Sequence, residues 1–188
     1  SSDVCSADLQ FQTGKFGGGV VGTLMSNFGL ELAFSEQGIG FGRASVGDRF
    51  VNEKLTQLGW SLGGEPSGHI VCRSITTTGD GVVAALQVLQ AMVEEEKSLV
   101  DLLSGFTKFP QRLKNIRVKT RFSPAEVPQL QQAIAQANEK LNGSGRVLLR
   151  ASGTEPLIRV MVEGDNSDLV DELVNSLANE VESYSLSL

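Results

Sequence analysis

Few residues in this sequence belong to the types that build covalent frameworks or metal clusters. Its 188 residues include only two cysteines and one histidine. Cys5 and Cys72 lie far apart in the sequence and show no metal-ligand spacing. We therefore expect both to be free thiols in a reducing compartment, and we expect no metal site built from cysteine and histidine.

Long apolar runs and clusters of basic residues are also missing. No run approaches the roughly 20 apolar residues that span a bilayer, and no basic segment followed by an apolar one opens the chain. The net charge is -6, whereas affinity for nucleic acid depends largely on neutralising phosphates. We expect a cytoplasmic protein that binds neither nucleic acid nor membrane, although individual arginines can still bind a small phosphorylated ligand.

The hydrophobic content is 40% and the charged content 20%, which is enough for a packed core in one or two domains. Residues 1–17 show no clear period and are interpreted as a flexible or non-native leader. The regular patterns divide into residues 18–106 and 107–188, and the segment from Gly105 to Pro110 is typical of a linker.

Strands alternate with helices in residues 18–106, which favours a parallel or mixed α/β sheet. Strands are predicted over residues 20–25 and 41–46. Ser26-Asn27, Asp48 and Asp80 are predicted to cap helices, and we consider Asp80 a cap rather than a metal ligand. The third helix carries an apolar stripe, which is made of Val82, Leu86, Leu89 and Val93.

Residues 107–188 are predicted to form a small α+β domain of strand, helix, hairpin and helix. Alternation over residues 116–121 indicates a strand with one wet face. Ser123 and Glu126 have the spacing of a capping box, which predicts a helix that starts there. Apolar residues then recur at helical spacing, and a closing helix begins near Asp168.

A short turn between two apolar runs combines two arginines, two hydroxyls and a glycine. If the chain stays extended, Arg150, Ser152 and Thr154 share one face, and Arg159 can approach from the opposite strand. The backbone N–H groups around Gly153 can add a nest for phosphate oxygens. These residues predict an anion site; the alternative is an ordinary hairpin with solvated arginines.

A second polar turn contains the only histidine. Glu65, Ser67 and His69 alternate, so an extended backbone would direct all three side chains the same way. A carboxylate, a hydroxyl and an imidazole could hold sugar hydroxyls through directional hydrogen bonds. A glycine-rich turn around a structural histidine is an equally good interpretation.

Five segments together resemble the C-terminal half of the α-D-phosphohexomutase family. They keep the family's order and have compatible spacing from about residue 18 to near the C-terminus. The matching segments are 20–27 (VVGTLMSN), 43–49 (RASVGDR), 64–69 (GEPSGH), 77–81 (TTGDG) and 150–159 (RASGTEPLIR).

The resemblance implies the family's third domain over residues 18–106 and its C-terminal domain over residues 107–188. It assigns sugar binding to Glu65 and Ser67, with His69 in a supporting role. It assigns the phosphate that is not transferred to one loop, made of Arg150, Ser152, Gly153, Thr154 and Arg159.

The members that this chain resembles interconvert glucosamine 6-phosphate and glucosamine 1-phosphate, on the route to UDP-N-acetylglucosamine and peptidoglycan. They are intramolecular phosphotransferases that use an enzyme phosphoserine, Mg²⁺ and a hexose bisphosphate intermediate. The phosphoserine and the metal loop belong to the family's first two domains. This chain has no Asp-x-Asp-x-Asp cluster and no serine in a matching motif, so we expect no catalytic residue, no metal ligand and little or no activity from it alone.

Pro66 departs from the family's frequent asparagine, which removes a backbone donor and stiffens the loop. The exact sugar preference is therefore open. One alternative is a mutase for glucose or mannose phosphates, and another is a module that binds phosphosugars without catalysis. The sequence does not predict an oligomeric state.

Overall fold

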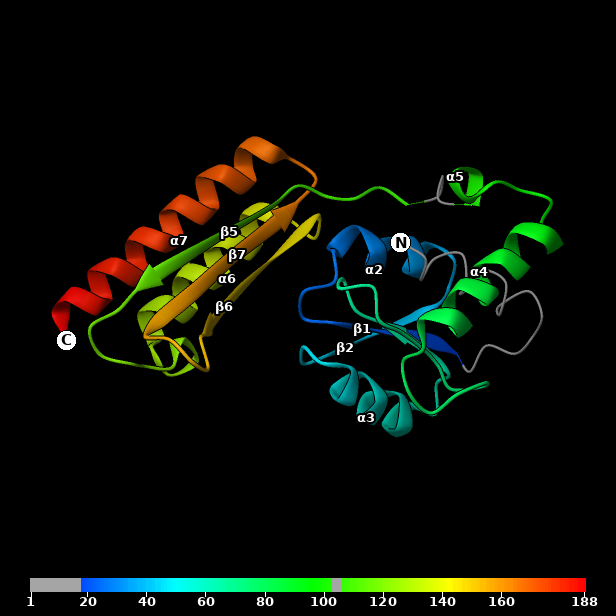
Figure 1. Ribbon diagram of the computed structural model, residues 1–188. Coiled ribbons are helices and arrows are strands. Elements are labelled where there is room, and N and C mark those ends of the chain that lie inside the picture. The colour runs from blue at the N-terminus through cyan, green and yellow to red at the C-terminus, as the bar shows by residue number, and fades with distance from the viewer. Residues whose placement is uncertain (1–17, 103–105) are drawn as a thin grey trace. The chain divides into compact units, whose positions relative to one another are not determined.

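The chain forms two compact units. The computed structural model describes residues 18–102 and 106–188, and the two units meet in sequence at Lys108 and Phe109 (Figure 1). The predicted leader and the first residue of the predicted linker, Gly105, lie outside the described residues. Within the described part, no helix is long and apolar enough to cross a membrane.

The first unit is built on a mixed sheet, as predicted. In the described residues four strands are ordered β2-β1-β3-β4. Strands β1, β2 and β3 are parallel to one another, and β4 pairs antiparallel with β3. Their bounds are β1 Gly19–Thr23, β2 Gly40–Ala44, β3 Leu62–Gly64 and β4 Ile70–Cys72.

Helices cover both faces of this sheet, because strand β1 has apolar side chains on both faces. Val20 of β1 packs in a cluster with residues of α2 (Phe28–Glu36) and α4 (Gly81–Glu94). Its neighbour Val21 packs in another cluster with residues of α3 (Asp48–Leu58). Successive side chains of a strand point to opposite faces, so α2 and α3 lie on opposite sides of the sheet (Figure 1). A short helix, α5 (Leu99–Leu102), follows α4.

Two of the three predicted helix caps in this unit are confirmed. The side chain of Asn27 accepts the Gly29 N–H, and that of Asp80 accepts the N–H groups of Val82 and Val83. Asp48 is the first residue of α3 and not its cap; the N-cap is Gly47, with φ at +127°. An aspartate is strained at such a backbone angle, whereas glycine is not.

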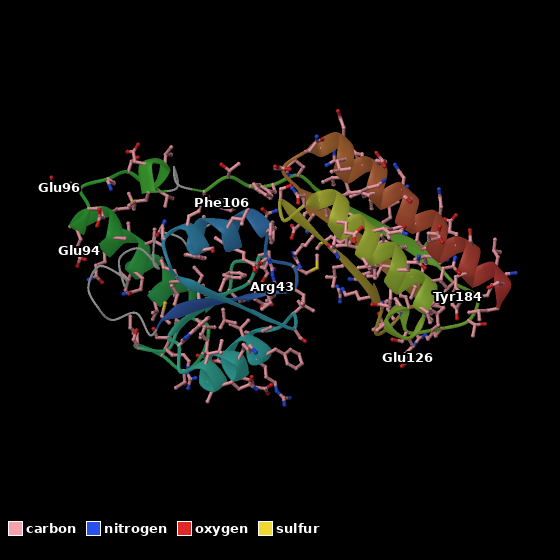
Figure 2. The ribbon with its side chains drawn as sticks, turned by 180° about the vertical axis from the view of Figure 1, so that it is seen from behind. Arg43, Glu94, Glu96, Phe106, Glu126 and Tyr184 are labelled. Carbon is pink, nitrogen blue, oxygen red and sulfur yellow. The ribbon has the colours of Figure 1, made fainter. Side chains whose placement is uncertain are left out.

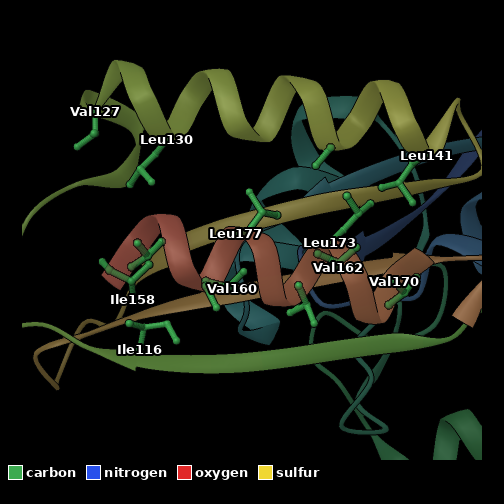
Figure 3. Close-up of a cluster of buried hydrophobic side chains, with 14 of the residues drawn as sticks. Ile116, Val127, Leu130, Leu141, Ile158, Val160, Val162, Val170, Leu173 and Leu177 are labelled. Atoms are coloured by element: carbon green, nitrogen blue, oxygen red, sulfur yellow. The ribbon is translucent and has the colours of Figure 1, made fainter. Parts of the chain in front are cut away.

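The second unit is a three-stranded antiparallel sheet, ordered β5-β7-β6 among the described residues, with two helices packed against it. Apolar residues of α6, α7 and one face of the sheet point toward one another (Figure 3). Buried members of this core include Leu130, Leu141, Val160 and Leu177. The bounds are β5 Gln111–Arg117, α6 Pro128–Leu141, β6 Gly145–Ala151, β7 Leu157–Gly164 and α7 Ser167–Ser187.

Two local predictions in this unit are wrong. Ser123 precedes a single 3₁₀ turn, Pro124–Glu126, and its side chain makes no capping hydrogen bond. Helix α6 begins at Pro128 because Val127 is extended, and proline disfavours the helical region for the residue before it. The strand predicted over residues 116–121 ends at Arg117 and begins earlier, at Gln111.

Replacing Leu177 by alanine is expected to destabilise the second unit by about 2–5 kcal/mol, because it leaves a cavity in the core. The side chain is 2% exposed on α7, whereas Leu186 of the same helix is 73% exposed. Leu186→Ala serves as the control and should change the free energy of unfolding by less than about 0.5 kcal/mol. Urea titration monitored by circular dichroism measures both, and equal effects would contradict the described core.

Candidate functional site

The first group of candidate residues lies in the turn that joins β3 to β4. The Gly68 N–H donates to the Glu65 carbonyl, and the Glu65 N–H donates to the His69 carbonyl, both at 2.9 Å. Gly68 has φ at +94°, which suits glycine in the position that closes such a hairpin. The segment is therefore a tight turn rather than the extended stretch that the alternation predicted.

This turn lies at the edge of the sheet where the parallel strands end. Strands β2 and β3 both run toward this edge, so the segment after β2 lies beside the turn after β3. Ligands of open α/β sheets bind at the carboxyl ends of the strands. The topology thus places Glu65 at the edge where a ligand is expected.

The Glu65 carboxylate is held by the start of α3. Its Oε1 accepts the Gly47 N–H at 2.7 Å, and its side chain is 8% exposed. The N-terminus of a helix carries a partial positive charge and unpaired N–H groups. Glu65 therefore accepts, from a distant segment, the N–H of the N-cap residue of α3.

Ser67 and His69 lie together beside this carboxylate. The Ser67 Oγ is 2.9 Å from the His69 Nδ1, and the same nitrogen is 3.8 Å from the Glu65 Oε2. The His69 side chain is 64% exposed. The turn therefore brings all three predicted side chains together, with two of their polar groups open to solvent.

Arg43 of β2 fixes the neighbouring loop after β1. Its Nη1 donates to the carbonyls of Thr23 and Ser26 at 2.9 and 2.8 Å, and its Nε and Nη2 donate to the Glu31 carboxylate (Figure 2). With its guanidinium occupied by these acceptors, Arg43 stabilises the loop. Its place in a sequence motif did not indicate this structural role.

The second group of candidate residues lies on β6 and β7. Arg150 and Arg159 are directly opposite each other in the antiparallel register. Among the described residues neither has an acidic partner, and the buried Nε of Arg159 has no acceptor. Like charges directly opposite each other destabilise a strand pair. An anion between the two guanidinium groups would offset that repulsion and supply the missing acceptor.

The turn between these strands is compact, and the chain is not extended through it. Strand β6 ends at Ala151, and the Ser152 N–H donates to the Leu157 carbonyl at 2.9 Å. The buried Ser152 Oγ accepts the Glu155 N–H at 3.3 Å. The prediction that Arg150, Ser152 and Thr154 share one face of a strand is therefore wrong, because Ser152 turns the chain.

The tip of the turn leaves backbone donors open. Gly153 and Thr154 are exposed, and a Cβ added to Gly153 would meet no atom within 4 Å. Within residues 18–102 and 106–188, the N–H groups of these two residues have no acceptor. Free N–H groups beside two arginines provide the chemistry of an anion nest.

Arg121 braces this turn and was not predicted as a functional residue. Its Nη2 donates to the Thr154 carbonyl at 2.9 Å, and the nearby Val118 N–H donates to the Pro156 carbonyl at 3.0 Å. The alternation over residues 116–121 indicated only a wet strand face. Only the fold brings Arg121 against a loop that lies 33 positions further along the chain.

The described residues do not fit a magnesium site. Among them no three acidic, histidine or cysteine side chains are grouped so that they could hold a metal ion. Magnesium binds through carboxylates and phosphate oxygens, and the acidic side chains of the two turns are not grouped in this way.

Two family models match the chain in sequence order. The model described as phosphoglucomutase/phosphomannomutase, alpha/beta/alpha domain III, matches residues 4–109. The model for the C-terminal domain of the same family matches residues 113–180. The chain therefore belongs to the phosphoglucomutase/phosphomannomutase family, the α-D-phosphohexomutases, and contains its third and C-terminal domains.

Two similar curated proteins are both named phosphoglucosamine mutase. The chain is 77% identical over 177 residues to the phosphoglucosamine mutase of Marinomonas sp. (strain MWYL1), which covers 94% of the chain and 40% of that protein. It is 54% identical over 172 residues to the phosphoglucosamine mutase of Aeromonas hydrophila, covering 92% of the chain and 39% of the relative. The chain thus spans about 40% of the length of the relatives it matches.

Solved structures share the fold at lower identity. The N-acetylphosphoglucosamine mutase of Aspergillus fumigatus, solved in complex with GlcNAc-6P and magnesium, matches with a TM-score of 0.78. The match covers 98% of this chain and 43% of that one at 21% identity. At this identity the comparison supports the architecture alone.

Removing the Glu65 carboxylate is expected to free the Gly47 N–H. In Glu65→Ala, amide exchange at Gly47 should accelerate about tenfold, the value of one hydrogen bond of roughly 1.4 kcal/mol. Glu65→Gln keeps an oxygen acceptor and serves as the control, with exchange close to that of the wild type. Hydrogen exchange followed by NMR gives both rates, and an unchanged rate in Glu65→Ala would show that the carboxylate does not hold Gly47.

Proposed function

We propose that this chain is the sugar- and phosphate-binding part of an enzyme that interconverts glucosamine 6-phosphate and glucosamine 1-phosphate. The family membership and the shared name of the similar proteins support this substrate class. One observation carries the binding role: two arginines face each other across β6 and β7 without a carboxylate, and a buried guanidinium nitrogen there lacks an acceptor.

In this proposal the second unit binds the phosphate that stays on the sugar. Arg150 and Arg159 supply forked N–H donors that match phosphate oxygens. Gly153 and Thr154 add backbone N–H groups, and the Ser152 hydroxyl retains its proton for donation while its oxygen holds the turn. The ligand is a dianion at neutral pH, so it offsets both arginine charges.

The first unit orients the sugar. Glu65 uses Oε1 to accept the Gly47 N–H, which leaves Oε2 for a sugar hydroxyl. Ser67 can donate to or accept from a neighbouring hydroxyl, and His69 supports Ser67 through the contact at 2.9 Å. Directional contacts from fixed groups select one sugar orientation.

The chemical step requires groups that lie outside the described residues. A phosphoserine donates its phosphoryl group to the free sugar hydroxyl, which gives a hexose bisphosphate. The other phosphate then returns to the serine, and the isomeric monophosphate leaves. Phosphoryl transfer depends on positioning and on charge stabilisation, and this chain contributes positioning. A magnesium ion would stabilise the transferred charge through ligands supplied elsewhere in a full-length enzyme.

Inorganic phosphate is expected to stabilise the chain through the arginine pair. At ten times its dissociation constant, a ligand that binds only the folded state adds about 1.4 kcal/mol. The midpoint of thermal unfolding should therefore rise with phosphate relative to chloride at equal ionic strength. The rise should be lost in Arg150→Ala and in Arg159→Ala.

Arg112→Ala is the matched control for this experiment, because it removes the same charge from the same sheet. Arg112 pairs with Asp171 on α7, away from the turn. Phosphate should stabilise this variant as much as the wild type. An equal phosphate effect in all four proteins would indicate general ion binding and would argue against the arginine pair as a site.

A full-length enzyme tests the reaction itself. When this chain replaces the matching segment of the Marinomonas sp. relative, we expect turnover of glucosamine 6-phosphate, with slower turnover of glucose 6-phosphate and mannose 6-phosphate. Arg150→Ala or Arg159→Ala in that enzyme should weaken substrate binding about tenfold or more, the loss of a charge-assisted hydrogen bond. The isolated chain should show no turnover.

Each alternative predicts a different result. Faster turnover of glucose or mannose phosphates would assign the chain to those mutases. Binding without turnover in the full-length protein would favour a phosphosugar-binding module. Turnover by the isolated chain would contradict the proposal that this chain binds the substrate without supplying the reacting groups.

A further inference from the structure

Helix α4 carries an apolar stripe that is exposed among the described residues of the first unit. Val82, Leu86, Leu89 and Val93 follow one another at spacings of four, three and four residues, so they share one face of the helix. Their exposed fractions are 71, 57, 54 and 76%. Leucine and valine side chains gathered on one face of a helix normally pack against another element.

The opposite face of α4 already packs within the first unit. Ala84 belongs to the core cluster that includes Val20 and Leu62, and Ala91 packs with Leu102. The helix therefore has apolar side chains on two sides. A helix that is apolar nearly all round is typical of a protein interior rather than of a surface.

Polar residues do not interrupt the stripe. The polar side chains of α4 are Gln87, Gln90 and Glu94, and hydrogen bonds link Gln87 to Gln90 and Gln90 to Glu94. The acidic residues Glu94 and Glu96 lie at the C-terminal end of the helix (Figure 2). An exposed, uncharged apolar surface of this kind is typical of an interaction site.

A groove continues this surface toward the Glu65–His69 turn, the candidate sugar turn. It has a volume of about 400 Å³ and lies between α4, β4 and α5. Gly68 of the Glu65–His69 turn lines one part of it, and Leu89, Met92 and Leu99 line another. A partner seated on α4 would therefore adjoin the turn that holds Glu65.

We propose that this apolar face of α4 is the docking surface for another domain of the full-length mutase. The match to the Marinomonas sp. relative includes 94% of this chain but only 40% of the relative. The unmatched part of the relative is therefore about one and a half times as long as the matched part. The family model that matches this unit describes it as domain III, one of several domains. The proposal rests on the proposed function, because it takes the partner from the same family of enzymes.

The occupant is accordingly an α/β domain with a complementary apolar face, part of the same polypeptide. Such a domain would bring its own groups to the sugar turn from the side of Gly68. A domain that carries reactive groups could in this way approach a sugar held by Glu65.

The accessibility of α4 tests this docking surface without relying on activity. Leu86→Cys and Val93→Cys are introduced into the isolated chain and into the full-length protein in which the chain replaces the matching segment of the Marinomonas sp. relative. Maleimide labelling of each cysteine is followed by peptide mass spectrometry, which separates it from Cys5 and Cys72. We expect labelling at both positions to be at least tenfold slower in the full-length protein.

Leu186→Cys is the control, since Leu186 is 73% exposed on α7 in the other unit. It should be labelled at the same rate in both proteins. Equal labelling of Leu86→Cys in both proteins would overturn the proposal. Protection that appears in the isolated chain and grows with its concentration would also overturn it, because the occupant would then be a second copy.

A second pair of measurements separates docking from a folding defect. Leu86→Gln should leave the thermal midpoint of the isolated chain unchanged, because the side chain is exposed there, and should lower that of the full-length protein. A lowered midpoint in the isolated chain would contradict the exposed position of Leu86. If the full-length protein shows no turnover while Leu86→Cys in it is still protected from labelling, the proposed function is contradicted and the docking surface remains supported.

Discussion

One hydrogen bond, from the Gly47 N–H to the Glu65 carboxylate, connects the two segments on which the candidate sugar turn depends. It joins the start of α3 to the β3–β4 turn, at the edge where the parallel strands end. Helix α3 has no capping side chain of its own, so the carboxylate satisfies the helix while the helix orients the carboxylate. Both partners lose an interaction if either moves, which keeps Oε2 in a defined place.

The second unit differs from the first, because among the described residues its arginine pair has no carboxylate partner. Arg146 and Arg112 of the same sheet each pair with a carboxylate, Glu163 and Asp171 respectively. Arg150 and Arg159 do not pair in this way among the described residues. Leaving two opposed cations uncompensated costs stability, and a bound phosphate would remove that cost. The contrast between paired and unpaired arginines on one sheet is the strongest argument for an anion site there.

Helix α4 shows the same contrast for apolar side chains. Leu177 of α7 is buried in a complete core, whereas Leu86 of α4 is 57% exposed beside a groove. An apolar stripe in a sequence predicts a contact but does not identify the partner. In α7 the partner is the sheet of the same unit, and for α4 we infer a domain of the longer enzyme.

Local signals in the sequence predicted much of the fold. The mixed sheet with helices and the hairpin of the second unit were expected, and the caps at Asn27 and Asp80 were correct. These predictions succeeded because short-range hydrogen bonds and side-chain periodicity determine them. The capping box at Ser123 failed because Pro128 keeps Val127 extended, a constraint that outweighs the match to a motif.

The sequence by itself determined which residue types could bind a phosphosugar and in which segments they lie. The tertiary structure decided how those residues meet. Glu65 finds Gly47 across 18 positions and Arg121 finds Thr154 across 33, and no local pattern encodes such pairs. Contacts of this kind depend on strand order and register, which arise only when distant segments pack together.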